Sequence, residues 1–164
     1  MDAEADNSKA TAQAQGVNSY PTIKYFKKGS TEALPYEGAR AEKDFIEFIN
    51  ANAGTHRTVG GGLDAAGGTI EALDTIVKKF QGAYGDGVAE AKKAAAALSD
   101  KYAQYYVKVF EKAHANKGYL DKEIKRLEGL LKKGNLAQEK LDDLTARSNI
   151  LRRFLAKEEE KSEL

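Results

Sequence analysis

The chain has 164 residues, of which 41% are hydrophobic and 31% charged, with only two prolines, a composition typical of a folded protein rather than a disordered one. Its 26 basic and 25 acidic side chains leave a formal charge of +1, so nucleic acid is not an expected partner. No run approaches the roughly 20 apolar residues that a transmembrane helix needs, so membrane insertion is not expected either. One or two small domains fit this length.

A short helix is predicted at residues 7–15. Asn7 or Ser8 can act as its N-cap, because a side-chain oxygen there can accept a hydrogen bond from an unpaired backbone N–H. Gly16 suits the left-handed position that ends a helix.

After this helix, the sequence predicts a β-hairpin and a second helix. Alternating apolar residues predict strands at 20–26 and 33–37, joined by turn chemistry at 27–30. An apolar stripe predicts a helix over 41–52 that ends near Gly54. A lone hairpin is marginal in water, so we expect this first part to be loose or self-associating.

Residues 60–68, GGGLDAAGG, form a glycine-rich stretch that could be mistaken for a phosphate-binding loop. Such a loop needs a Lys followed by Ser or Thr after its last glycine, whereas here Thr69, Ile70 and Glu71 follow. A flexible linker over residues 58–69 is the better interpretation.

Beyond this stretch the apolar spacing is helical almost throughout. Helices are predicted around residues 70–80, 88–98, 102–113, 120–131 and 141–155. Glycines 82, 85 and 87 are expected to break the pattern before the second of these helices, Gly134 to end the fourth, and Asn135 to cap the fifth. Short connections favour antiparallel neighbours in a compact bundle.

The polar and aromatic residues of this bundle favour structural roles. Tyr102, Tyr105 and Tyr106 are expected to pack in the core with their hydroxyls at the rim, rather than to form a peptide-binding stripe. His56 and His114 stand far apart without ligand-spaced companions, so no metal site is expected. Solvated or paired surface charges are expected at Arg126, Glu128, Arg147, Arg152 and Arg153.

The motifs GVNSYPTIKYF at residues 16–26 and YEGAR at 36–40 resemble the second half of a thioredoxin domain of the protein disulfide isomerase family. The resemblance implies a cis peptide bond before Pro21 and a substrate groove lined by Tyr20, Pro21 and Thr22. Taken alone, the same residues would form a turn leading into an edge strand.

Arg40 matches the arginine that, in this family, swings in to favour the thiolate of the buried cysteine, since a nearby positive charge lowers a thiol pKa. Taken alone, it would be a solvated surface arginine. The chain contains no cysteine, so no catalytic residue is assigned, and no cofactor is expected.

The spacing YAQYYVKVFEKA, then LDKEIKRLEGLL, then KLDDLTARSNILRRF, resembles the helical carboxy-terminal domain of endoplasmic reticulum protein 29, over about residues 63–155. The predicted fold is therefore mainly α, with a five-helix bundle preceded by a truncated thioredoxin-like α/β half-domain. The expected parts are a half-domain at 1–57, the linker at 58–69, the helical domain at 70–157 and a tail at 158–164.

The tail ends in Lys161, Ser162, Glu163 and Leu164, which resemble the Lys-Asp-Glu-Leu retrieval address of the endoplasmic reticulum lumen. This resemblance implies a lumenal location and a retrieval receptor as partner. The start, MDAEADNSKA, lacks the apolar core of a signal peptide. A retrieval signal without an entry signal predicts a chain that has lost its amino-terminal part, although a cytosolic product that truly starts at Met1 stays open.

The resemblances together predict a fragment of an endoplasmic reticulum protein disulfide isomerase that acts in oxidative folding of secretory proteins. Without redox cysteines, this chain is expected at most to bind unfolded secretory polypeptides or other chaperones. The alternative is a non-catalytic escort chaperone resembling endoplasmic reticulum protein 29.

Overall fold

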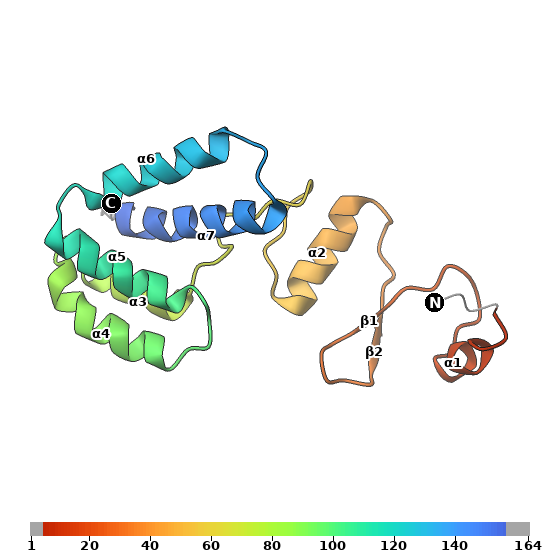
Figure 1. The fold of residues 1–164 in the computed structure, drawn as a ribbon. Helices are drawn as coiled ribbons and strands as arrows, with labels where there is room; N and C mark the ends of the chain where they lie inside the picture. The colour runs from red at the N-terminus through yellow and green to blue at the C-terminus, as the bar shows by residue number, and fades with distance from the viewer. Residues whose placement is uncertain (1–4, 157–164) are drawn as a thin grey trace, which may run out of the picture. The chain divides into compact units, whose positions relative to one another are not determined.

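The computed structural model describes residues 5–156, in which seven helices accompany one small two-stranded sheet, as the mainly α prediction requires (Figure 1). The chain divides into two compact units, with the boundary between Gly54 and Thr55. Among the described helices, none is both long and apolar enough to cross a membrane.

The first unit contains helix α1 (Lys9–Ala14), strands β1 (Lys24–Phe26) and β2 (Ala33–Pro35), and helix α2 (Glu42–Ala53). The strands pair antiparallel, with Tyr25 opposite Leu34. This is the predicted order of helix, hairpin and helix, but β1 begins at Lys24 rather than at residue 20, because residues 19–21 form bends instead of pairing.

In the first unit, both helix ends predicted at glycines are confirmed. Gly16 has φ +62° and Gly54 has φ +63°, a left-handed conformation that glycine adopts without steric cost. The start of α1 differs in detail: Ser8 occupies the N-cap, but its hydroxyl donates to the Asn7 side chain at 3.3 Å and no side-chain cap is formed.

The first unit has little buried core. Tyr36 stacks on Phe45 with ring centroids 4.8 Å apart, and Tyr25 meets Phe48 edge-on at 6.0 Å. No residue of α2 is fully buried, and Ile49 keeps 40% of its surface exposed. The apolar face of α2 thus lacks much of a packing partner.

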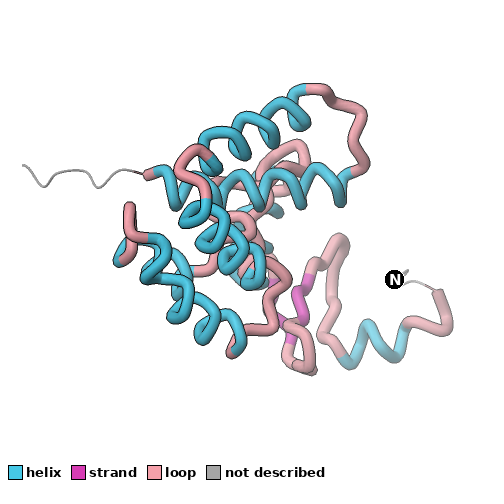
Figure 2. Tube along the Cα trace, turned by 60° about the vertical axis from the view of Figure 1, so that its left-hand side comes forward, coloured by secondary structure: helices cyan, strands magenta, loops and turns pink. Residues whose placement is uncertain are grey.

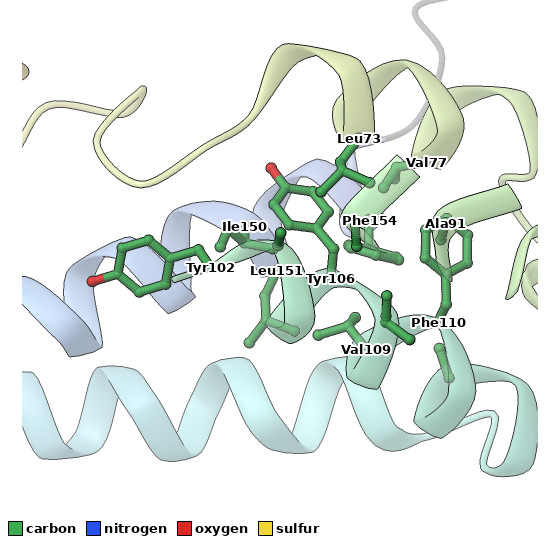
Figure 3. Packing of buried hydrophobic residues seen from close by; sticks show 14 of the residues in the cluster. Leu73, Val77, Ala91, Tyr102, Tyr106, Val109, Phe110, Ile150, Leu151 and Phe154 are labelled. Carbon is green, nitrogen blue, oxygen red and sulfur yellow. The ribbon is translucent and has the colours of Figure 1, made fainter. Parts of the chain in front are cut away.

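The second unit is a bundle of five helices (Figures 1 and 2). They are α3 (Glu71–Lys79), α4 (Tyr84–Ala96), α5 (Ala103–Ala115), α6 (Tyr119–Lys132) and α7 (Gln138–Leu155). Helix α4 packs against α3 and α5, whereas α7 packs against α6, α3 and α5. Figure 3 shows the core between them, where Phe110 meets Phe154 edge-on at 4.9 Å and Tyr106 is fully buried.

Two glycines that were expected to precede the second predicted helix lie inside it. Gly85 and Gly87 belong to α4, and only Gly82 has a positive φ, of +79°. A Cβ on Gly87 would lie 2.6 Å from a ring carbon of Phe110, so this glycine allows α4 to approach α5 closely. Here glycine serves a helix contact rather than a break.

The predicted cap of the last helix is also wrong. Ala137, not Asn135, is the N-cap of α7, and it makes no side-chain capping bond. Asn135 instead adopts φ +52° in the connection after Gly134, a left-handed conformation that Asn tolerates better than most residues.

The glycine-rich segment differs from the flexible linker that the sequence predicted. Arg57 and Leu63 form an antiparallel bridge, and the segment belongs to the second compact unit. The buried amide of Asn149 on α7 donates to the backbone carbonyls of Asp64 at 2.8 Å and Gly67 at 3.0 Å. These bonds hold the segment against the bundle.

Candidate functional site

The three predicted groove residues lie together in the turn that leads into β1. The peptide bond between Tyr20 and Pro21 is cis, as the family resemblance implied. Tyr20 exposes 57% of its surface, and Pro21 and Thr22 are exposed as well. The Thr22 hydroxyl donates to the Ser19 carbonyl at 2.6 Å, which closes the turn locally.

One side of β1 is unpaired in the described part of the chain. The ladder to β2 continues one residue beyond the strand, where the Tyr36 N–H donates to the Ile23 carbonyl at 2.9 Å. Lys24 lies opposite Pro35, which has no N–H, so this is a non-hydrogen-bonded pair whose backbone groups point away from the partner strand. We call this side of residues 20–26, with the side chains of Tyr20, Pro21 and Thr22, the free edge.

A side chain of the same strand ties the free edge to the preceding helix. The Lys24 ammonium donates to the carbonyl of Gln15, the residue that follows α1. The backbone groups of Lys24 thus face the free edge, whereas its side chain forms a hydrogen bond inside the first unit.

Arg40 is exposed in the loop before α2, directly ahead of the N-cap residue Ala41. The Ala41 N–H donates to the Asp44 carboxylate at 3.1 Å, which starts the helix. Within residues 5–156, no hydrogen bond or ion pair joins Arg40 to the free edge. The predicted redox-modulating role of Arg40 and the groove role of Tyr20, Pro21 and Thr22 stay predictions.

The four residues of the retrieval-like signal, Lys161, Ser162, Glu163 and Leu164, lie outside the described residues. The reading of this tail therefore rests on sequence alone.

In the bundle, the expected core packing is confirmed for Tyr102 and Tyr106, which are 8% and 0% exposed. The expected position of the hydroxyls at the rim is wrong for Tyr106. Its hydroxyl accepts the Ile70 N–H at 3.1 Å and donates to the Asp74 carboxylate at 2.5 Å. The Tyr105 hydroxyl is also buried, and it has no hydrogen-bond partner in the described structure.

This polar cluster was not recognised in the sequence. Arg153 on α7 completes it, with its Nε 3.2 Å from the Asp74 carboxylate. Burial raises the pKa of Asp74 above its ordinary value, and the bond from Tyr106 and the charge of Arg153 oppose that rise. Asp74 carries no motif, and its partners lie far away in the sequence, so no local signal could have identified it.

The remaining charges predicted at the surface form ion pairs. Their closest contacts are Arg126 with Glu123 at 2.7 Å, Arg147 with Asp143 at 3.1 Å, and Arg152 with Glu128 at 3.1 Å. The first pair lowers the pKa of Glu123, chiefly through the hydrogen bond from Arg126. Exposed pairs of this kind contribute little to stability, about 0–1 kcal/mol each.

The two histidines lie in different surroundings. The His56 ring lies 3.3 Å from the Asp64 carboxylate. His114 lines a cavity of about 280 Å³ together with Lys117 and the first turn of α4. Residues 5–156 contain no group of three or more His, Cys, Asp or Glu side chains arranged to hold a metal ion.

The two units define a class of protein in which a thioredoxin-like helix, hairpin and helix precede a five-helix domain. Residues 68–154 match the family described as endoplasmic reticulum protein ERp29, C-terminal domain, and the chain belongs to this family.

Relatives that share both parts are named as protein disulfide isomerases. The chain is 58% identical over 160 residues to protein disulfide-isomerase tigA of Aspergillus niger, covering 98% of this chain and 44% of the relative. It is 49% identical over 172 residues to protein disulfide-isomerase erp38 of Neurospora crassa, covering 100% of this chain and 47% of the relative. A third relative, protein disulfide isomerase-like 2-2 of Oryza sativa, is 33% identical over 92% of this chain and 43% of its own length. The chain thus spans less than half of these proteins.

Proposed function

We propose that this chain is the polypeptide-binding part of an endoplasmic reticulum protein disulfide isomerase that acts in oxidative folding of secretory proteins. Thiol–disulfide exchange begins with attack by a thiolate, and this chain supplies no cysteine. Its own contribution is therefore binding. The names of the relatives and their match to both units support this role. In this role the chain acts in the lumen, and a retrieval receptor reads Lys161 to Leu164.

The observation that carries the proposal is the free edge of β1. An extended peptide can add to an unpaired strand edge through main-chain hydrogen bonds, which recognise no particular sequence. The Lys24 N–H and C=O supply such groups, and the exposed ring of Tyr20 offers apolar contact beside them. A site of this kind fits unfolded polypeptides of varied sequence.

Two substitutions at one position test the free edge. Lys24→Pro removes the N–H that faces the edge, while the ladder to β2 stays available because Lys24 is in a non-hydrogen-bonded pair. Lys24→Ala is the matched control, since it keeps this N–H and removes only the ammonium contact to Gln15. The probe is a cysteine-free unfolded peptide with alternating apolar residues, titrated against the full ¹⁵N-labelled chain.

We expect amide shifts at residues 20–26 on titration, with binding weakened about tenfold in Lys24→Pro and unchanged in Lys24→Ala, as the loss of one backbone hydrogen bond predicts. Equal affinities in the two variants would remove the free edge from the proposal.

The helical unit is a second candidate for binding, because it has its own core and matches the ERp29 family over residues 68–154. In this case the chain acts as an escort chaperone without thiol chemistry. Peptide-induced shifts confined to Glu71–Leu155 would favour this function over strand addition.

A further inference from the structure

Two residues of β1 turn their backbone groups toward the free edge. The ladder to β2 has a hydrogen-bonded pair at Ile23 and Tyr36. Hydrogen-bonded and non-hydrogen-bonded pairs alternate along an antiparallel ladder, so the pairs formed by Lys24 and Phe26 are non-hydrogen-bonded. The N–H and C=O groups of these two residues therefore point away from β2, and an edge of this kind can accept one further strand.

The side chains beside these groups combine an exposed ring with positive charges. Tyr25 contacts α2, so Lys24 and Phe26, which alternate with it, lie on the other face of the hairpin. Phe26 keeps 45% of its surface exposed. Lys28 follows in the exposed turn. The free edge thus carries an aromatic ring between two lysines.

The charges of β1 select the register in which a second copy of β1 fits this edge. A two-fold axis perpendicular to the sheet pairs the two strands antiparallel. With Lys24 on the axis, Lys24 would lie opposite Lys24 of the second copy. With Phe26 on the axis, Lys24 would lie opposite Lys28 of the second copy. Like charges directly opposite one another destabilise a strand pair, so both registers are disfavoured.

The register with Tyr25 on the axis avoids this repulsion. Lys24 then lies opposite Phe26 of the second copy, and each such pair exchanges both of its backbone hydrogen bonds. The aliphatic stem of Lys24 can lie along the exposed Phe26 ring while its ammonium keeps the bond to the Gln15 carbonyl. Covering this ring also removes apolar surface from water, which favours association.

We propose that the free edge pairs with the free edge of a second copy, so that the two hairpins form one continuous antiparallel sheet with the two Tyr25 residues at its centre. The strand is short, so the dimer forms and dissociates with protein concentration. The dimer covers the edge to which the proposed function assigns unfolded polypeptides, and the two kinds of binding exclude one another. The pairing itself does not depend on that function.

Two substitutions of the exposed Phe26 test the register. Phe26→Glu places a carboxylate opposite Lys24 of the second copy, whereas Phe26→Lys places an ammonium there, and both remove the same ring. Sedimentation velocity of the full chain over a wide range of concentration measures the association. We expect the wild type to pass from monomer to dimer, and Phe26→Lys to dimerise about tenfold more weakly than Phe26→Glu, because the pair occurs twice in each dimer.

Amide exchange of the wild-type chain is a second measurement that needs no substitution. The amides of Lys24 and Phe26 should exchange more slowly as the concentration rises, since they gain partners in the dimer, whereas the Tyr25 amide, which faces β2, should change little. The proposal is overturned if the chain stays monomeric, if the two Phe26 variants associate equally, or if association leaves the Lys24 and Phe26 amides unprotected.

The same variants separate this inference from the proposed function. An uncharged unfolded peptide carries no group that distinguishes a carboxylate from an ammonium at residue 26, so it should bind both variants alike. A difference between the variants in self-association, with equal peptide binding, is the result expected for the dimer.

Discussion

The hydroxyl of Tyr106 donates a hydrogen bond to the carboxylate of Asp74 and joins α5 to α3 inside the helical unit. The same oxygen accepts the N–H of Ile70, the N-cap residue of α3, which has no side-chain cap of its own. A tyrosine from another helix thus provides a hydrogen-bond partner for both the N-cap residue of α3 and the half-buried carboxylate of Asp74.

Removing the Tyr106 hydroxyl should destabilise the helical unit. Tyr106→Phe leaves the Ile70 N–H and the Asp74 carboxylate without this partner, which costs about 1–3 kcal/mol in the free energy of unfolding. Tyr105→Phe is the control, because the Tyr105 hydroxyl is buried without a hydrogen-bond partner and its removal should change stability by less than about 0.5 kcal/mol. Urea unfolding followed by circular dichroism measures both, and equal losses would contradict the assigned bonds.

Asp74 and Glu123 should give pH dependences of opposite sign. Burial raises the folded pKa of Asp74, so its contribution to stability is full below the ordinary carboxyl pKa of about 4 and is lost as pH rises through the raised value. Arg126 lowers the folded pKa of Glu123, so that contribution is present above the ordinary value and is lost as pH falls through the lowered one.

The measurement is the unfolding free energy of the wild type minus that of Asp74→Asn or Glu123→Gln across the acidic range. With rising pH the first difference should fall and the second should rise. Slopes of the same sign would show that one of these two environments is wrongly assigned.

Two helical glycines should respond oppositely to alanine. Gly87→Ala places a Cβ 2.6 Å from Phe110 and 3.0 Å from Phe80, and overpacking of this kind costs about 1–3 kcal/mol. Gly129→Ala in α6 meets no atom within 4 Å and should stabilise the protein by about 0.5–1 kcal/mol through better helix propensity. Thermal unfolding of both variants checks the prediction, which fails if Gly87→Ala is neutral or stabilising.

Native-state hydrogen exchange should separate the two units. The amides of α2 are expected to exchange through local opening, because no residue of that helix is fully buried. The amides near Val109 and Ile150, both fully buried, should exchange only with global unfolding of the bundle. Equal protection of α2 that grows with protein concentration would mean that self-association covers the first unit.

The local sequence pattern predicted much of the fold, because the position and the end of each helix depend mainly on residues that are close together in the chain. The apolar stripes of α3, α5, α6 and α7 fall where the 3.6-residue period places them, since one face of each helix must enter the core. Gly16 and Gly54 were recognised because a left-handed residue ends a helix without reference to any distant group.

Features that depend on contacts between residues far apart in the sequence were decided only by the tertiary structure. Gly85 and Gly87 resemble Gly82 in the sequence, but they lie within α4, where a Cβ on either residue would lie 2.5–2.6 Å from a side chain of α5. Residues 58–69 look like a flexible linker in the sequence, but in the structure Asp142 binds the preceding Arg57 and Asn149 binds Asp64, each pair 85 residues apart in the chain. Tyr106 and Asp74, 32 residues apart, become partners only when α5 packs near α3. Composition and periodicity carry no information about such pairs, because their geometry exists only in the folded bundle.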